Sequence, residues 1–245
     1  MNDELLHTYG VDIDLADLTK EGYIKPHAYQ IMINRAAEQH LKTLDLGVEK
    51  TIAFGLAWAL VSLSVEIVKQ EVGTTRLFAT TWHAERRGPF FRRDMQFKNE
   101  KGELIVNATT FSVLLDLETR SIFRKKELPF PLGEPTPTFV MEASPSFREK
   151  HEYETLETRK INRSYIDRLG HVNNCRYGEF AFDALADDEA KLENLERMDI
   201  YFVSEMRPQD NFNVCKCKEN NKIYIQGQNN IKQDVSFNVV FKFKE

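Results

Sequence analysis

The sequence predicts an α+β fold in which two similar halves each wrap an antiparallel sheet around a central helix. Three observations support this prediction. Each half of the 245-residue chain carries one amphipathic helix that is followed by several strand-like runs. A proline-rich stretch separates the two halves. The halves also match one another around a shared glycine, which indicates an internal repeat.

The proline-rich stretch sets the expected domain boundaries. Five of the eight prolines lie between Pro129 and Pro145, and proline is disfavoured in helix interiors and in central strands. We therefore predict an N-terminal domain at 1–128, a linker at 129–148 and a C-terminal domain at 149–245. Each of the two domains has an ordinary size.

The internal match begins at two glycines, Gly22 and Gly170, each of which precedes a short polar turn and a helix. With these glycines aligned, two further pairs coincide, namely Tyr29 with Tyr177 and Ala36 with Ala184. The match predicts that the two halves contain the same elements in the same order.

The first predicted helix runs from about Pro26 to Leu44. Proline suits its first turn, because the missing N–H would have no partner there. The expected apolar stripe consists of Ile31, Ala36, Ala37 and Leu41. The second predicted helix runs from about Asn174 to Leu185, and Asn173 or Asn174 can cap it.

Several β-rich runs follow each predicted helix, and one more strand is expected ahead of each. The runs of the first half are Ala59 to Val68, Leu77 to Arg86, Arg92 to Lys98 and Val106 to Asp116. Those of the second half are Met198 to Glu205, Asn211 to Lys218, Ile223 to Asn229 and Val235 to Phe243. Hairpin turns are predicted at 99–102 and 219–221. A long helix wrapped by such a sheet is the hotdog architecture, so we predict a double (tandem) hotdog.

Composition argues against several classes of function. The net charge of −5 argues against a general affinity for nucleic acid. Three cysteines without a CxxC pair argue against a disulfide framework and a zinc site, and they fit a reducing cytoplasm. The first residues lack the pattern of a secretory signal, and the longest apolar run, 52–68, is too mixed to span a bilayer. We expect no metal and no cofactor.

The stretch from Asp167 to Tyr177 is the strongest candidate for chemistry. Asp167 stands four residues before His171, and Asn173 and Asn174 follow at the predicted start of a helix. An imidazole can move protons near neutral pH, and the free N–H groups of a helix start can hold a developing negative oxygen. These are the parts that an acyl-transfer or hydrolysis site requires.

Ordered motifs across both halves resemble the acyl-acyl-carrier-protein (acyl-ACP) thioesterases, the fatty-acid-releasing enzymes of plant plastids and many bacteria. In the first half the resemblance rests on Gly22 to Pro26, Ala36 to His40, Leu56 to Trp58, Thr81 and Trp82, Arg92 to Met95, and Leu115 to Arg120. In the second half it rests on Asp167, His171 to Asn174, Tyr177, and Ser204 to Arg207.

The resemblance implies a catalytic network in the second half. Asp167, His171 and Glu205 match the family's Asp, His and Glu, whereas Leu169 stands at the position of a family Asn. Met206 stands where the plant enzymes have a cysteine. A thioether cannot act as a thiolate nucleophile, so water attack assisted by a general base is the expected route.

The expected roles follow from this network. The substrate carbonyl points at the N–H groups near Asn173 and Asn174, while Glu205, alone or with His171, activates water. Alternatively, His171 polarises the substrate or protonates the leaving thiolate, and Asp167 orients His171 or the helix start. Cys175 is not expected to be a nucleophile, because the matched motif places none there.

The first half lacks this chemistry and, by the resemblance, contributes the acyl-chain pocket. Candidate pocket residues are Met32, Ala36 and Trp58. A basic patch that receives the acidic carrier protein is sought among Arg86, Arg87, Arg92 and Arg93, and also among Arg120, Arg124, Lys125 and Lys126.

The resemblance implies hydrolysis of fatty acyl-ACP, with release of the free fatty acid and an end to chain elongation. The partner is the acylated phosphopantetheine arm of the acyl carrier protein, and the chain itself is a monomer or a homodimer. Two alternatives stay open: an acyl-CoA thioesterase, and a catalytically decayed acyl- or ACP-binding protein. A hotdog hydratase would instead add water to an enoyl substrate.

Overall fold

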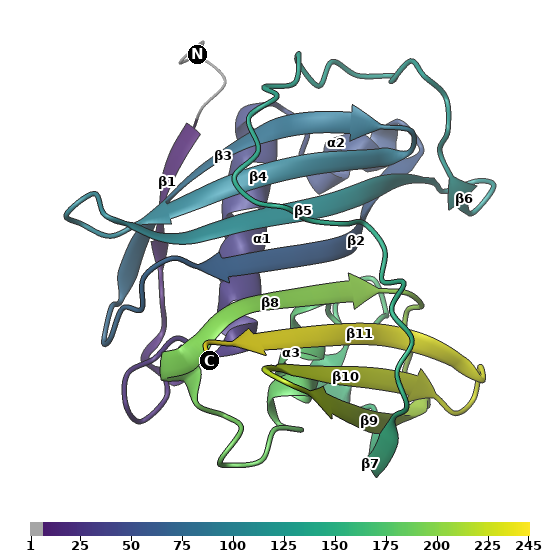
Figure 1. Ribbon diagram of the computed structural model, residues 1–245. Helices are drawn as coiled ribbons and strands as arrows, with labels where there is room; N and C mark the ends of the chain where they lie inside the picture. Colours follow the sequence, from purple (N-terminus) through teal and green to yellow (C-terminus); the bar gives the residue numbers. More distant parts are fainter. Residues whose placement is uncertain (1–6) are drawn as a thin grey trace.

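The computed structural model describes residues 7–245, which form one 11-stranded antiparallel sheet packed against few helices (Figure 1). The helices are α1 (Pro26–Thr43), α2 (Val48–Ala53) and α3 (Cys175–Phe182). The strands of the first half are β1 (His7–Asp12), β2 (Leu56–Ile67), β3 (Arg76–Arg87), β4 (Phe90–Lys98), β5 (Leu104–Asp116) and β6 (Ser121–Ile122). Those of the second half are β7 (Glu154–Lys160), β8 (Leu195–Phe202), β9 (Asn211–Glu219), β10 (Lys222–Asn229) and β11 (Asp234–Phe243). The predicted α+β class with an antiparallel sheet is confirmed.

The sheet joins the two halves edge to edge. Its strand order is β1-β3-β4-β5-β2-β8-β11-β10-β9-β7, with β6 paired to β5. Read from each outer edge inward, the two halves therefore have the same order of strands. β2 and β8 pair in the middle, in a register that sets Leu63 opposite Ile200.

The turn ahead of each long helix has the same hydrogen bonds in both halves. In the first half the Thr19 N–H donates to the Tyr23 carbonyl at 2.8 Å. At the matching position of the second half the Asp167 N–H donates to the His171 carbonyl at 2.9 Å. Gly22 and Gly170 have φ of +88° and +84° in these turns, a region that glycine occupies without strain.

Most predicted elements are confirmed, although many of their ends differ by a few residues. The strand expected to reach Glu205 ends at Phe202, so Glu205 lies in a loop. α3 begins at Cys175 and ends at Phe182, shorter than predicted at both ends. The short elements α2 and β6 were not predicted, and both predicted hairpin turns are present.

The buried stripe of α1 differs slightly from the predicted one. Ile31 and Leu41 are only half-buried, and the core side instead carries Tyr29, Met32, Ile33, Ala36 and His40. These residues follow the spacing of one helical face. The helix faces the sheet together with α3, and the large side chains that fill this core are fully buried: Phe97, Phe180, Phe212, Phe237 and Phe241.

Helices α1 and α3 approach each other closely at Gly178 of α3. A Cβ atom there would lie 3.3 Å from the Gln30 side-chain oxygen and 3.4 Å from the His27 Cα. The first distance is slightly tighter than ordinary van der Waals contact and the second is at its lower limit, so glycine avoids a small displacement of the Gln30 side chain. The contact between α1 and α3 therefore crosses between the two halves of the chain.

The connecting segment between β6 and β7 contains no helix or strand and crosses the face of the sheet opposite α1 (Figure 1). Sheet side chains bind its backbone, since the Ser62 hydroxyl donates to the Ser144 carbonyl at 2.9 Å. Arg197 donates to the Glu142 carbonyl at 2.8 Å. In the described part of the chain, no helix is both long and apolar enough to cross a membrane.

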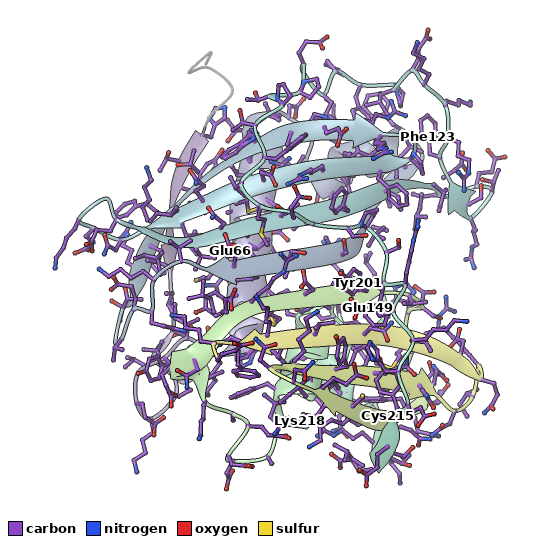
Figure 2. All side chains as sticks on the ribbon, viewed as in Figure 1. Glu66, Phe123, Glu149, Tyr201, Cys215 and Lys218 are labelled. Carbon is purple, nitrogen blue, oxygen red and sulfur yellow. The ribbon has the colours of Figure 1, made fainter. Side chains whose placement is uncertain are left out.

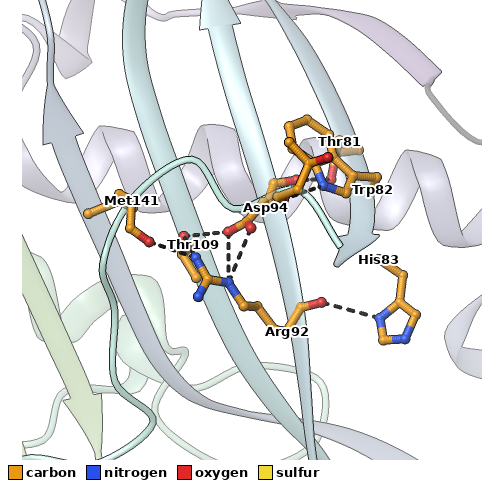
Figure 3. Close-up of polar contacts among 8 residues, drawn as sticks. Thr81, Trp82, His83, Arg92, Asp94, Thr109 and Met141 are labelled. Atoms are coloured by element: carbon orange, nitrogen blue, oxygen red, sulfur yellow. Dashed lines mark hydrogen bonds and ion pairs between the residues drawn. The ribbon is translucent and has the colours of Figure 1, made fainter. Parts of the chain in front are cut away.

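A buried ion pair lies under this connecting segment. The Arg92 guanidinium binds Asp94 at 3.1 Å and donates to the Met141 carbonyl at 2.7 Å, and Asp94 also accepts from the Thr109 hydroxyl at 2.5 Å (Figure 3). The side chains of Arg92 and Asp94 are 9% and 0% exposed. Each charge is therefore compensated by the other and by neighbouring dipoles.

Removing one member of this pair should destabilise the fold strongly. Arg92→Met leaves the Asp94 carboxylate buried without its counter-charge, which we expect to cost about 3–5 kcal/mol of unfolding free energy. Urea denaturation measures this change. The double variant Arg92→Met/Asp94→Leu should be closer in stability to the unsubstituted chain, and a double variant less stable than the single one would contradict this account.

Candidate active site

Asp167 shapes the loop that carries His171. One of its carboxylate oxygens, Oδ1, accepts the Leu169 N–H at 2.8 Å and the His171 N–H at 3.4 Å. The Gly170 N–H donates to the Asp167 carbonyl at 3.1 Å. The carboxylate thus binds backbone rather than the imidazole, and it acts on His171 by fixing the turn.

His171 and Glu205 meet across this loop. The Nε2 atom of His171 lies 3.0 Å from Oε2 of Glu205, although the two residues are far apart in the sequence. Their side chains are 32% and 47% exposed, so water can reach both. The other oxygen of Glu205, Oε1, accepts a hydrogen bond from Arg207 at 2.7 Å.

The charge of Glu205 is set by competing effects. Partial burial raises the pKa of the Glu205 carboxyl, but the hydrogen bond from Arg207 and the charges of His171, Arg207 and Lys232 lower it more. The net result is a pKa below the ordinary glutamate value. Glu205 is therefore an anion throughout the neutral range.

Hydrogen bonds hold the backbone of Glu205 and Met206 next to the His171 loop and α3. The Val172 N–H donates to the Met206 carbonyl at 2.9 Å, and the Met206 N–H donates to the Tyr177 hydroxyl at 3.4 Å. Lys232 donates to the Glu205 carbonyl. Met206 itself is fully buried, so its side chain serves the core.

Asn173 and Asn174 differ in what they can offer a substrate. The Asn173 side-chain oxygen accepts the Cys175 N–H at 2.9 Å, and its own N–H donates to the Tyr165 carbonyl at 2.8 Å. Within residues 7–245 the Asn174 N–H has no acceptor. Of the two predicted oxyanion donors, only Asn174 has a free backbone N–H, because that of Asn173 is engaged in the turn.

Among the described residues, the side chains of Leu169 and Cys175 make no polar contact with His171 or Glu205. Leu169 is 66% exposed at the tip of the loop. The Cys175 sulfur accepts a hydrogen bond from Asn34 at 3.3 Å, across the contact between α3 and α1. Burial raises the pKa of the Cys175 thiol to about 11, so it remains protonated and is a poor nucleophile.

The first half keeps the turn but not the chemistry. The Thr19 hydroxyl accepts the Tyr23 N–H at 3.2 Å, as Asp167 accepts that of His171. Tyr23, at the position that matches His171, forms an isolated backbone β-bridge with Val72. An acid–imidazole pair does flank this turn, since His27 Nε2 lies 3.5 Å from Asp17 Oδ1, but it does not involve the position that matches His171.

The three predicted pocket residues lie in packed regions. Met32 and Ala36 are buried in the main core. Trp58 lies in a second apolar cluster, where its ring packs edge-on against that of Phe91 with the ring centroids 5.0 Å apart. Neither of two surface cavities, of about 560 and 420 Å³, is lined by them. The larger cavity is lined by Phe54, Leu56, Asp116, Phe123, Lys125, Lys126, Glu127, Leu128 and Pro129.

The predicted basic patch needs correction. Arg92 is buried beneath the connecting segment, and Arg93, which points to the opposite face of β4, binds His40 and Thr81. Adjacent residues of a strand face opposite sides, so the two could never have shared one surface. Arg86 is half-buried and donates to two carbonyls of the connecting segment at 2.5 and 2.6 Å. The exposed members of the predicted sets are Arg87, Arg120, Arg124, Lys125 and Lys126.

Two residues that support the site were not found from the sequence. Lys232 lies on the turn between β10 and β11, and Asn34 lies on α1. Lys232 hydrogen-bonds to the Glu205 carbonyl and Asn34 to the Cys175 sulfur, each from a segment distant in the sequence, and neither stands in a motif that marks it.

The ionisation of Glu205 should depend on Arg207. Arg207→Ala removes the hydrogen bond and the positive charge that lower the Glu205 pKa, so the carboxyl should titrate at a higher pH. A carbon-13 NMR titration of the carboxyl groups measures the change, with Arg168→Ala as the control for loss of an exposed arginine.

Arg207→Ala should also lower the stability of the fold at neutral pH. A lowered pKa in the folded state stabilises the fold above the unfolded-state pKa of a glutamate, and this contribution is lost as the pH falls through the lowered value. The two chains should therefore converge in stability at acid pH. An unchanged Glu205 titration would refute the coupling.

Comparison with known proteins identifies the family of the chain. Family models for the acyl-ACP thioesterase N-terminal domain and C-terminal domain match residues 4–127 and 148–243. No curated protein sequence matches the chain.

Solved structures share the whole fold. The crystal structure of an acyl-ACP thioesterase from Bacteroides thetaiotaomicron has a TM-score of 0.87 at 18% identity, with 100% of both chains covered. The 12:0-ACP thioesterase from Umbellularia californica has a TM-score of 0.77 at 14% identity, covering 98% of this chain and 97% of that one. At these identities the structures show a common hotdog-like fold, whereas the two family models together cover most of the sequence. The chain therefore belongs to the acyl-ACP thioesterase family and is a thioester hydrolase.

Proposed function

We propose that this enzyme hydrolyses the thioester of fatty acyl-ACP by base-assisted attack of water and releases the free fatty acid. The observation that carries the proposal is the 3.0 Å contact between His171 Nε2 and Glu205 Oε2, beside the start of α3. An imidazole and a carboxylate in contact can take up and return one proton, as hydrolysis of a thioester requires.

The His171–Glu205 pair takes part in both steps of the reaction. As water attacks the carbonyl carbon, the pair accepts one of its protons and a tetrahedral oxyanion forms. The carbon–sulfur bond then breaks, and His171 gives the proton to the leaving thiolate. The products are a carboxylic acid and the free thiol of the phosphopantetheine arm, so the pair returns to its starting state.

The oxyanion is held by the start of α3. The Asn174 N–H is free of protein acceptors among the described residues and lies at the positive end of the helix. A donor fixed at the place where negative charge develops stabilises the transition state more than the ground state. Asp167 and Asn173 contribute by holding the turn that aims this N–H.

No covalent intermediate is part of this mechanism. Met206, at the position of the plant cysteine, offers a buried thioether. Cys175 carries a thiol with a raised pKa and an Asn34 partner. Because neither side chain is suited to act as the nucleophile, water takes that role.

The chain is, we propose, a tandem hotdog with unequal halves. The repeated turns at Thr19 and Asp167 and the shared strand order support a duplication. Residues 1–128 supply the acyl-chain pocket, residues 129–148 link the two domains, and residues 149–245 carry the catalytic groups. Met32, Ala36 and Trp58 remain the candidates for that pocket, which would have to open when the acyl chain enters.

The carrier protein would dock on the exposed basic residues near the larger cavity, in a cytoplasmic enzyme. Lys125 and Lys126 line that cavity, and Arg87 is exposed beside Arg86, which binds the same stretch of backbone. Positive charge there would attract an acidic carrier and speed its encounter.

Removing either member of the catalytic pair should abolish most activity. His171→Ala and Glu205→Gln should each lower kcat for thiol release from acyl-ACP by roughly 10²–10⁴-fold, the contribution typical of general acid–base catalysis. Cys175→Ser is the matched control and should keep most of the rate. Unchanged rates in both site variants would refute the assignment.

The same assay distinguishes the competing functions. Turnover of acyl-CoA equal to or better than that of acyl-ACP would favour a CoA thioesterase. Tight binding of acyl-ACP without release of thiol would indicate a decayed enzyme that only binds. Addition of water to an enoyl substrate, without thiol release, would indicate a hydratase.

Leu169 offers a separate test of the loop. Leu169→Asn places an amide at the exposed tip, two residues from His171, and restores the residue type of the family. If this position limits catalysis, kcat should rise while stability changes little, because the leucine is exposed. An unchanged kcat would mean that the His171–Glu205 pair works without a polar group at position 169.

A further inference from the structure

A cluster of potential metal ligands lies on the face of the sheet opposite the helices. His151, from the connecting segment, meets Cys217 and Glu219 of β9 there, and one ligand atom from each lies within 4.8 Å of the others. Cys217 and Glu219 are two residues apart on a strand, so their side chains share a face. Val214 of the same strand points to the helix side and is in the main core.

Individual distances show how the three groups converge. His151 Nδ1 lies 2.9 Å from Glu219 Oε1, and the Cys217 sulfur lies 3.5 Å from the same oxygen. An imidazole nitrogen, a thiol and a carboxylate thus surround one point. These are the three ligand types that zinc takes in proteins.

The orientation of His151 is fixed by its neighbours. Its ring stacks on Tyr224 with centroids 3.8 Å apart, and its side chain is only 6% exposed. The second ring nitrogen, Nε2, lies 3.3 Å from Glu149 Oε2 and makes no hydrogen bond among the described residues. Glu149 in turn accepts the Tyr224 hydroxyl at 2.9 Å.

The position of Glu149 beside Nε2 resembles the arrangement around metal-binding histidines, although Nε2 does not hydrogen-bond to it here. A ligating histidine commonly presents its other ring nitrogen to a carboxylate, which fixes the tautomer and strengthens the ligand. Here Nδ1 faces Glu219 and Cys217 while Nε2 faces Glu149. Figure 2 shows Glu149 on the connecting segment where it crosses the sheet.

We propose that His151 Nδ1, the Cys217 thiolate and the Glu219 carboxylate bind one Zn²⁺ ion, with a fourth position left to water. The sequence argued against zinc because it lacks a CxxC pair, but this set uses a Cys-x-Glu pair on a strand. The third ligand comes from a distant segment. Zinc would displace the proton of the Cys217 thiol when it binds.

A zinc ion bound here would act as a clamp that links two parts of the second half. His151 lies just ahead of β7, whereas Cys217 and Glu219 lie on β9. The ion would tie the end of the connecting segment to the sheet. Because the core face of the sheet carries α3 and the His171 loop, the clamp takes no part in thioester hydrolysis and does not depend on the proposed function.

Binding of Co²⁺ and Zn²⁺ to the full chain, with its thiols reduced, tests the proposal. We expect one equivalent of Co²⁺ to produce the near-ultraviolet absorption of a cobalt–thiolate bond, and Zn²⁺ to remove it by displacement. Cys217→Ser should abolish this absorption, and Cys175→Ser should leave it unchanged.

Two glutamate variants separate direct ligands from supporting groups. Glu219→Gln should weaken Zn²⁺ binding through the loss of a charged ligand. Glu149→Gln should weaken it by about 10- to 100-fold while keeping the cobalt–thiolate absorption, since it acts through His151. Glu157→Gln, an exposed carboxylate on β7, is the control and should bind Zn²⁺ as the unsubstituted chain does.

Protection of Cys217 tests the site without any substitution. Stoichiometric Zn²⁺ should slow the alkylation of Cys217 by iodoacetamide, read by mass spectrometry, and should leave the alkylation of Cys175 unchanged. EDTA should reverse the protection and leave the rate of thiol release from acyl-ACP unaltered. Equal alkylation with and without Zn²⁺, or equally tight Zn²⁺ binding by Cys217→Ser, would overturn the proposal.

Discussion

The pairing of β2 with β8 is the constraint on which the rest of the molecule depends. It turns two sets of strands into one sheet and places α1 and α3 side by side on the same face. The seam is reinforced on the opposite face, where the Ser64 hydroxyl donates to Asp199 at 2.5 Å and Arg197 binds the same carboxylate. Neither half could position its helix against the other without this seam.

The seam also explains how a repeated fold can support one site. Both halves build the same turn ahead of their helix, with closely similar backbone hydrogen bonds. The second turn carries His171 where the first carries Tyr23, and the loop after β8 supplies Glu205 to it. The carboxylate and imidazole near the first turn, Asp17 and His27, stand at other positions. The fold therefore provides two equivalent positions, and their side chains differ in a way that supports the proposed chemistry at the second position alone.

Local pattern was enough to predict much of this structure. Amphipathic spacing and proline placement gave the helices, the strands and the connecting segment, because these features act over short distances. The motif from Asp167 to Asn174 gave the loop of the site. Glu205 came from family resemblance, and its place in a loop beyond β8 could not be read from strand propensity alone.

The remaining features depend on which face a side chain takes and on what crosses it. Arg92 and Arg93 are adjacent and equally basic, yet one is buried under the connecting segment and the other binds His40. The cluster at Cys217 requires a histidine delivered by that same segment. A sequence does not show where an irregular segment of this length will lie on a sheet.

The electrostatics of Glu205 bear on which member of the catalytic pair holds the proton. Arg207 keeps Glu205 ionised, but a carboxylate with a lowered pKa is a weak base. General-base catalysis is most effective when the pKa of the base lies near the working pH, and imidazole is the side chain suited to neutral pH. In the proposed mechanism the proton of the attacking water therefore resides on His171, 3.0 Å away, while the Glu205 anion stabilises the imidazolium that forms. Arg207 thus makes Glu205 a better electrostatic partner, and a poorer final proton acceptor, than an isolated glutamate would be.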